Sequence, residues 1–476
     1  MAFVFGNQMY VWLGADGMNK KILLLLSLIL YLMFFLPVID WDIKTKAIAA
    51  LIIIQMLWIG RIFPLAHSSL LFMLLLSFHF FTYQETLAYF SSEVVWLLFA
   101  TFIISHAFIE TGLASRISFS VLKVSGGSGR ALLLISFLLM FVLAILIPSN
   151  VGKGNLVASV LDRLLKNLRK INTIENLGKA LFIGISYLAA ISGALVATGA
   201  SSTIYTFELF TSIHPDLNYI SWIVYFVPPV LLFTTLLWLL FIVKFPPEKV
   251  DRKKMMGLIE DGLEELGPLS LAEKKVMLVM GLTLLLWITQ SLHGFSIPLV
   301  GLLGAVLTVM PWIGVWKWNQ AKNSVDWDMM LFFASTLMVS GMLIKTGTIA
   351  SIADFFISMI TFQSPFFVLL LLILCTALLR VIFVNILGFL TIMIPLAIEI
   401  GETLGGYSPF VTAMVVFLVG IPGFFLITQS PVHLISFSFG YFSERELLRI
   451  GLPSFSLWVL TILGAVLLYW PYVVSH

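Results

Sequence analysis

Long apolar runs separated by short polar segments cover most of this chain. A helix of about 20 predominantly apolar residues is long enough to cross the hydrocarbon core of a bilayer. The pattern predicts spanning helices at 22–38, 46–60, 66–81, 93–109, 180–207, 219–243, 276–292, 296–313, 327–344, 408–440 and 452–473. We therefore predict an all-α polytopic membrane protein with about 11 transmembrane helices.

Two further apolar segments, 130–165 and 364–398, are predicted to be re-entrant hairpins, which enter the membrane and return to the same side. Each holds an asparagine near its middle, Asn150 in the first and Asn385 in the second. If either segment were a single span, every later loop would change sides. The excess of Lys and Arg on the cytoplasmic side would then disappear.

A short motif occurs twice, about half a chain apart. The first copy is Glu110-Thr-Gly-Leu-Ala-Ser-Arg116 and the second is Lys345-Thr-Gly-Thr-Ile-Ala-Ser351. Asn150 follows Thr111 by 39 positions, and Asn385 follows Thr346 by the same 39. Two copies of one unit in a membrane chain are typical of secondary transporters.

Each copy also contains a spanning segment that is rich in Gly, Pro, Ser and Thr. These segments are Ile191-Ser-Gly-Ala-Leu-Val-Ala-Thr-Gly-Ala-Ser-Ser-Thr203 and Gly420-Ile-Pro-Gly-Phe-Phe-Leu-Ile-Thr-Gln-Ser-Pro-Val-His433. A broken helix frees backbone groups that lipid cannot satisfy, so such breaks usually line a cavity. The N-termini of the half-helices then present positive dipole ends, which favour an anion. The alternative is a packing kink at each position.

Composition and charge agree with a membrane protein. Hydrophobic residues make up 60% of the chain, charged residues only 11%, and the mean hydropathy is +1.06. With a cytoplasmic N-terminus, 22 of the 27 Lys and Arg lie on the cytoplasmic side, and the C-terminus lies outside. Corresponding loops of the two copies carry opposite charge bias, which predicts that the repeats are inverted.

These patterns predict the domain organisation. N-terminal scaffold helices occupy 1–90, and the first inverted repeat occupies 91–243, with its hairpin at about 130–165 and its broken helix at about 180–207. A cytoplasmic loop at 244–275 and two scaffold helices at 276–313 follow. The second repeat occupies 314–476, with its hairpin at about 364–398 and its broken helix at about 408–440.

Several stretches resemble the divalent anion/sodium symporter family, which transports dicarboxylates, citrate and sulfate. They are Leu266-Gly-Pro-Leu-Ser-Leu-Ala-Glu-Lys-Lys-Val276, Leu285-Leu-Trp-Ile-Thr289, Val325-Asp-Trp327 and Gly440-Tyr-Phe-Ser-Glu-Arg-Glu-Leu-Leu-Arg-Ile-Gly-Leu-Pro453. The resemblance implies a homodimer held by scaffold domains. It also implies an elevator-type transport domain, which binds substrate between the hairpin tips and the helix breaks.

The resemblance also implies the site residues. The family's tips read Ser-Asn-Thr, whereas here they read Ser149-Asn150-Val151 and Val384-Asn385-Ile386. The breaks contribute Gly199 and Thr203 from the first repeat, and Ser430, Pro431 and His433 from the second. Because both tip threonines are missing, each tip lacks an oxygen that a hard cation would prefer. If sodium binds, we expect it at Ser149, Asn150 and Gly199, and we expect no other metal or cofactor.

Two cations are predicted to lie inside the membrane. Lys153 follows Asn150 by three residues, and Arg380 precedes Asn385 by five. A charge within a membrane is costly and marks a candidate functional group. We hypothesise that fixed positive charge replaces sodium, with Lys153 at the first site and Arg380 or His433 at the second. Alternatively, Lys153 snorkels to water, Arg380 faces away and pairs with a carbonyl or an acid, and His433 couples protons or only donates a hydrogen bond.

The sequence thus predicts a secondary transporter of a small anion, a dicarboxylate or related organic acid, in a bacterial inner membrane, with weak or no sodium dependence. The family resemblance implies that it works by an elevator-type mechanism. The alternatives are a proton-coupled carrier of a different solute, and a membrane sensor or assembly protein that has lost transport. No catalytic motif has usable context, so we do not predict an enzyme. Nucleic-acid binding has no support, because the basic residues follow the topology and form no single patch.

Overall fold

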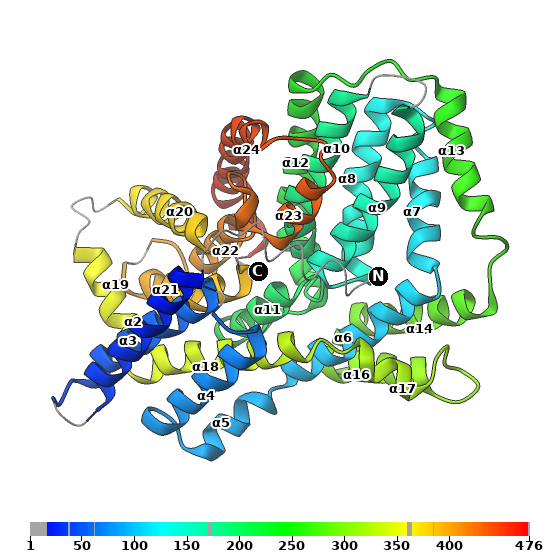
Figure 1. Ribbon diagram of the computed structural model, residues 1–476. Helices are drawn as coiled ribbons and strands as arrows, with labels where there is room; N and C mark the ends of the chain where they lie inside the picture. The colour runs from blue at the N-terminus through cyan, green and yellow to red at the C-terminus, as the bar shows by residue number, and fades with distance from the viewer. Residues whose placement is uncertain are drawn as a thin grey trace. The chain divides into compact units, whose positions relative to one another are not determined.

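The computed structural model describes residues 17–36, 39–60, 62–169, 174–358, 364–383, 385–404 and 406–474. Every regular element in these ranges is a helix (Figure 1). Within the described part of the chain, eight helices are long and apolar enough to cross a membrane. The predicted class, an all-α polytopic membrane protein, is therefore confirmed.

One compact unit contains the N-terminal helices together with α18. It comprises Met1–Ser91 and Trp327–Ile352. Its helices are α2 (Gly17–Phe35), α3 (Ile43–Ile59), α4 (Leu65–His79), α5 (Tyr83–Phe90) and α18 (Trp327–Lys345). Helix α18 packs against α3, α4 and α5, and Lys345 pairs with Glu85 at 2.7 Å. Helix α18 therefore belongs to the same compact unit as the N-terminal helices. The division of the chain into two repeats stays a prediction.

The second unit comprises Ser92–Asp326 and Ala353–His476, and it contains both hairpins and both broken helices. Its first part follows the first repeat in order. The elements are α6 (Glu93–Glu110), α7 (Leu113–Lys123), α8 (Gly129–Leu146), α9 (Asn150–Arg169), α10 (Glu175–Ile191), the 3-10 turn η1 (Ser192–Leu195), α11 (Ser201–Ile213) and α12 (Tyr219–Lys244). Helices α8 and α9 pack on each other and on α10, so the hairpin and the break are adjacent.

Connecting helices separate the two repeats. They are α13 (Arg252–Glu264), α14 (Leu271–Ile288), α15 (Gln290–His293), α16 (Ile297–Val309), α17 (Trp318–Ala321) and the 3-10 turn η2 (Lys322–Ser324). Helix α13 packs along α7, and α16 packs on α6 and α14. Helix α14 begins before the predicted 276, because Ser270 and Glu273 form a capping box at its N-terminus.

The second repeat has the same element order. After α18 come α19 (Thr348–Ser358), α20 (Pro365–Ile382), α21 (Ile386–Leu404), α22 (Pro409–Gly420), the 3-10 turn η3 (Ile427–Gln429) and α23 (Pro431–Ser438). The chain ends with α24 (Glu444–Gly464), the π turn η4 (Ala465–Tyr469) and α25 (Trp470–Val473). Helix α24 begins well before the predicted 452, because Ser443 and Glu446 cap it.

The duplicated Thr-Gly motif forms the same local structure in both copies. Gly112 and Gly347 have φ of 81° and 67°, a left-handed conformation that glycine adopts without strain. Thr111 and Thr346 each donate a hydrogen bond to the carbonyl four residues earlier, at 2.9 and 2.8 Å. An amphipathic 11-residue helix follows each turn, α7 in one copy and α19 in the other. The sequence prediction missed both short helices.

Arg116 fixes the connection between α13 and α14. Its guanidinium pairs with Glu273 at 2.6 Å and donates to the carbonyls of Leu266 and Gly267 at 3.1 and 3.0 Å. Burial raises the pKa of Glu273, but hydrogen bonds from Arg116 and from Ser270 outweigh it and hold that pKa below its usual range. The pair therefore stabilises the fold when Glu273 is ionised.

Replacing Arg116 with alanine should destabilise the protein by about 2 kcal/mol, because it removes charge-assisted bonds to a nearly buried carboxylate. Lys123→Ala is a matched control, since Lys123 pairs with Glu260 at an exposed position and should contribute less than about 1 kcal/mol. Thermal unfolding in detergent should separate the variants at pH 7. The separation should shrink at acidic pH, below the usual titration range of a glutamate, because the pKa of Glu273 is lowered and the pair is lost only when this carboxylate becomes protonated. Equal unfolding temperatures at pH 7 would contradict this prediction.

Candidate functional site

The first hairpin turns between α8 and α9. Ile147, the residue before Pro148, has an extended backbone that ends α8. The Oγ of Ser149 accepts a hydrogen bond from the backbone N–H of Gly152 at 3.0 Å and so caps α9. Asn150 begins α9, and the neighbouring Val151 is 42% exposed. The tip thus presents one amide and one apolar side chain at a helix N-terminus.

At the first broken helix, side chains donate hydrogen bonds to backbone carbonyls that the interrupted helix leaves without helical partners. Helix α10 ends in the turn η1, Val196 is extended, and α11 starts at Ser201. The Oγ1 of Thr203 donates to the carbonyl of Gly193 at 3.0 Å. The indole of Trp222 donates to the carbonyl of Ala194 at 2.9 Å. The predicted break is therefore real, and Thr203 is one of the residues that stabilise it.

Lys153 connects the first tip to the first break. Its Nζ lies 3.3 Å from the carbonyl oxygen of Gly199, and its side chain is fully buried. It does not extend to the protein surface as a snorkelling side chain would. Within the described ranges, no carboxylate lies within 4.0 Å of this ammonium. Lys153 thus offers a buried positive charge without a protein counter-charge.

Oxygen atoms of the tip and the break gather beside Gly193. A methyl group at its Cβ position would lie 3.4 Å from both the Oδ1 of Asn150 and the carbonyl oxygen of Gly199. This Oδ1 is buried and has no hydrogen-bond partner among the described residues. At Gly199, a Cβ would lie only 2.3 Å from the carbonyl oxygen of Gly193, so both glycines are needed for this close approach.

The second hairpin turns between α20 and α21. Asn385 is half-buried there, and its Oδ1 accepts hydrogen bonds from the backbone N–H groups of Leu387 and Gly388 at 2.9 and 3.2 Å. Its side chain therefore caps α21. The two tip asparagines differ, because the corresponding oxygen of Asn150 has no such partner. Val384 lies outside the described residues.

In the second break, α23 has a fully formed N-terminus. The Oγ of Ser430 accepts a hydrogen bond from the N–H of Val432 at 3.2 Å, and Pro431 occupies the first helical position. Proline suits that position because it has no N–H to leave unpaired. His433 is fully buried, and its Nδ1 lies 3.1 Å from the carbonyl oxygen of Leu426.

Arg380 connects the second tip to the second break. Its guanidinium donates to the carbonyl of Gly420 at 2.7 Å, to that of Gln429 at 3.1 Å, and to that of Phe383 beside the tip. The residue is 2% exposed, and no acid pairs with it in the described part of the chain. Arg380 therefore pairs with carbonyls, as one alternative of the sequence analysis predicted. These carbonyls belong to the second tip and the second break, so Arg380 does not face away from them.

The sequence analysis missed two residues that shape the breaks. The side-chain oxygen of Gln429 accepts the backbone N–H groups of Phe425 and Leu426 at 2.8 and 2.9 Å. A glutamine inside an apolar span, directly before Ser430, was a usable signal. Trp222 gave none, because its partner is a backbone carbonyl 28 positions earlier.

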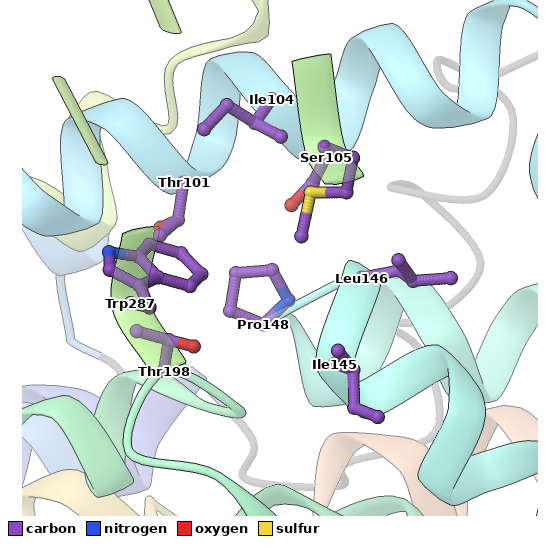
Figure 2. Close-up of a pocket in the computed structure, with 9 residues that line it drawn as sticks. Thr101, Ile104, Ser105, Ile145, Leu146, Pro148, Thr198 and Trp287 are labelled. Atoms are coloured by element: carbon purple, nitrogen blue, oxygen red, sulfur yellow. The ribbon is translucent and has the colours of Figure 1, made fainter. Parts of the chain in front are cut away.

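A small cavity adjoins the first tip (Figure 2). Pro148 and Thr198 line it together with residues from α6, α8 and α14. The lining residues are Thr101, Ile104, Ser105, Ile145, Leu146, Pro148, Thr198, Met280 and Trp287. They include three hydroxyls and no charge, so the cavity alone does not suit an anion.

Comparison with known proteins identifies the family. The family model described as the sodium:sulfate symporter transmembrane region matches residues 17–476. The chain belongs to this family. Sodium:sulfate symporter-type proteins are transporters, so this family member is a membrane transport protein and not an enzyme.

Similar members of the family come from several organisms. The inner membrane protein YbhI of Escherichia coli is 25% identical over 66% of this chain and 67% of its own length. The citrate/succinate antiporter of E. coli is 24% identical over 77% of this chain and 76% of its own. The putative malate transporter YflS of Bacillus subtilis is 24% identical over 56% of this chain and 57% of its own.

A solved structure shares the fold. It is that of MtrF from Neisseria gonorrhoeae, described as one of a class of antimetabolite efflux pumps. The two structures match with a TM-score of 0.53 and 12% sequence identity, over 92% of this chain and 96% of MtrF. At this identity the likeness concerns the fold and not the transported solute.

Proposed function

We propose that this protein is a secondary transporter that exchanges small organic dianions, such as dicarboxylates, without requiring sodium. The observation that carries the proposal is the buried ammonium of Lys153, 3.3 Å from the carbonyl oxygen of Gly199. It sits where the first tip and the first break converge. The tip resembles those of sodium-coupled relatives, which leads us to expect a cation there. The ammonium of Lys153 is such a cation, and it belongs to the chain instead of being a bound ion.

Arg380 has the equivalent role at the second hairpin. Its three bonds to backbone carbonyls bring the second tip and the second break together. A sodium ion bound by backbone carbonyls would also hold such segments together while contributing positive charge. The two repeats thus each contain one fixed cation at the junction of tip and break.

Charge favours exchange of dianions. Lys153 and Arg380 are buried, and neither has a carboxylate partner in the described ranges. Moving two uncompensated charges across a membrane interior is costly. A bound dianion would compensate both, so the loaded carrier should change orientation more readily than the empty one. A related protein from E. coli is named a citrate/succinate antiporter, which agrees with exchange.

The proposed motion is of the elevator type, in which the hairpins and broken helices move past neighbouring helices. It is what the family resemblance implies, and the packing of α8 and α9 on α10 joins the first hairpin to the first broken helix, as a common moving group requires. Homodimer formation stays a prediction from the family resemblance.

Thermal unfolding of the purified protein tests the proposed specificity. We would titrate succinate, citrate, malate and sulfate in sodium buffer, and again with potassium in place of sodium. A ligand that binds only the folded protein raises its unfolding temperature. We expect a dicarboxylate to give equal shifts in both buffers. Shifts only in sodium would overturn the fixed-charge mechanism, and a shift that changes only with pH would favour proton coupling.

Proteoliposomes then separate exchange from the other functions. Vesicles loaded with unlabelled dicarboxylate should take up labelled dicarboxylate much faster than empty vesicles do. Equal uptake by loaded and empty vesicles would contradict exchange. A protein that binds no anion and transports none would instead fit a membrane sensor or assembly protein.

A further inference from the structure

Six exposed basic side chains gather where α12 ends and α13 begins. We call them the linker patch: Arg130, Lys244, Lys249, Arg252, Lys253 and Lys254. The backbone brings Arg130 to the others, because a Cβ on Gly129 would lie 3.3 Å from Pro247. A Cβ on Gly127 would likewise lie 2.2 Å from the carbonyl oxygen of Arg252. The linker therefore lies directly on the turn that starts α8.

No member of the linker patch has an ion pair in the described part of the chain. By contrast, five other basic residues in this unit pair with a carboxylate: Arg116, Lys123, Arg163, Lys166 and Lys179. Two acids do lie within the linker, Glu248 and Asp251. Both accept backbone hydrogen bonds at helix N-termini, and within the described residues neither forms an ion pair with a member of the patch.

The two linker acids cap neighbouring helices. The carboxylate of Glu248 accepts the N–H groups of Asn176 and Leu177 at the start of α10, at 2.6 and 3.0 Å. That of Asp251 accepts the N–H groups of Lys253 and Lys254 at the start of α13. Helix α8 has no such cap, because the side chain of Ser128 makes no capping bond. The N-terminus of α8 therefore differs from those of α10 and α13, which each bind a carboxylate of the linker.

Exposed apolar residues flank the patch. Val243 at the end of α12 is 74% exposed, and Val124 before the turn to α8 is 73% exposed. The indole of Trp238 lies nearby and donates to the carbonyl of Arg130 at 3.0 Å. Helices α8 and α12 are both candidate membrane spans. Basic side chains, exposed valines and a tryptophan at the ends of such helices are typical of the headgroup region of a bilayer.

We propose that the linker patch binds the phosphate of anionic lipids, with the unfilled N-terminus of α8 as part of the site. The phosphate would take the place that Glu248 occupies at α10, and the acyl chains would cover Val243 and Val124. Clusters of four to eight basic residues next to a spanning helix attract anionic lipids by about this chemistry. The apolar flanks favour a lipid over a free phosphate ion.

Lipid binding to the purified full-length protein tests this proposal. Retention of phosphatidylglycerol and of phosphatidylcholine would be measured by native mass spectrometry, alongside thermal stabilisation by inorganic phosphate. The test variant is Arg252→Ala/Lys253→Ala/Lys254→Ala. The control is Lys274→Ala/Lys317→Ala/Lys322→Ala, which removes three exposed basic residues that have no ion pair in the described part of the chain and lie on other connecting segments. Unfolding temperatures in phosphatidylcholine alone would verify that both variants fold.

We expect the wild type and the control to retain phosphatidylglycerol in preference to phosphatidylcholine. The test variant should bind phosphatidylglycerol on the order of 100-fold more weakly, given the usual contribution of each basic residue near a membrane surface. Equal retention of both lipids by the wild type would overturn the proposal, as would equal loss in the test and control variants. Stabilisation by inorganic phosphate without lipid preference would also overturn it and would identify a soluble phosphate as the ligand.

Discussion

Replacing Lys153 with alanine is expected to weaken dicarboxylate binding strongly in potassium buffer. The variant loses a buried ammonium that no carboxylate of the described ranges neutralises. A hydrogen bond to a charged group contributes about 1.5–3 kcal/mol, which corresponds to a loss of affinity of about 10- to 100-fold. Binding is measured as the shift in unfolding temperature with added dicarboxylate.

Sodium should partly restore binding to this variant. Truncation leaves the carbonyl of Gly199 without the ammonium, and the nearby Oδ1 of Asn150 already has no partner among the described residues. Both are hard oxygens of the kind that such cations bind. We therefore expect a dicarboxylate to stabilise Lys153→Ala more in sodium than in potassium. Lys166→Ala is the matched control on α9, because Lys166 is exposed and pairs with Asp162. If Lys153→Ala bound dicarboxylate as the wild type does, Lys153 would have no part in recognition.

Replacing Arg380 with alanine is expected to impair folding as well as transport. The variant leaves the carbonyls of Gly420, Phe383 and Gln429 without their donors, in a region where water is scarce. A buried polar group left unpaired costs about 1–3 kcal/mol, so the total loss of stability should be on the order of 3 kcal/mol. The unfolding temperature should fall sharply even without ligand.

Two further variants separate charge from geometry at this position. Arg380→Lys keeps the charge but cannot donate to three carbonyls in the same planar arrangement, so it should recover only part of the stability. Arg449→Ala, at an exposed position on α24, should leave the unfolding temperature nearly unchanged. An Arg380→Ala protein as stable as the wild type would show that these carbonyls find other partners, and Arg380 would then lose its proposed structural role.

The two buried cationic side chains therefore differ in how many of their N–H groups are already bonded to protein oxygens. Arg380 donates to three protein oxygens, whereas Lys153 donates to one. The tip asparagines differ in the same sense, since the Oδ1 of Asn385 caps α21 and that of Asn150 is unpartnered. Substrate contact should accordingly depend more on the first hairpin, and rigidity more on the second.

Many local features could be predicted from the sequence because they depend on nearby residues. The apolar runs, the Thr-Gly turns and the breaks rich in Gly, Ser and Thr each occupy one short segment, and each has a local physical cause. The same holds for the placement of Asn150 and Asn385 at the hairpin tips. Helix starts were predicted less well where a capping box extends the helix beyond its apolar run, as at Ser270 and Ser443.

The sequence by itself therefore determined that this is a polytopic helical membrane protein with a duplicated hairpin and broken helix, and it indicated the family. Only the tertiary structure decided what the buried charges touch. The contact of Lys153 with Gly199 spans 46 positions and that of Arg380 with Gln429 spans 49. Such contacts depend on how helices pack, and no periodicity within one segment encodes them. A basic residue in an apolar run shows that a charge is buried, but its partner is fixed by the fold.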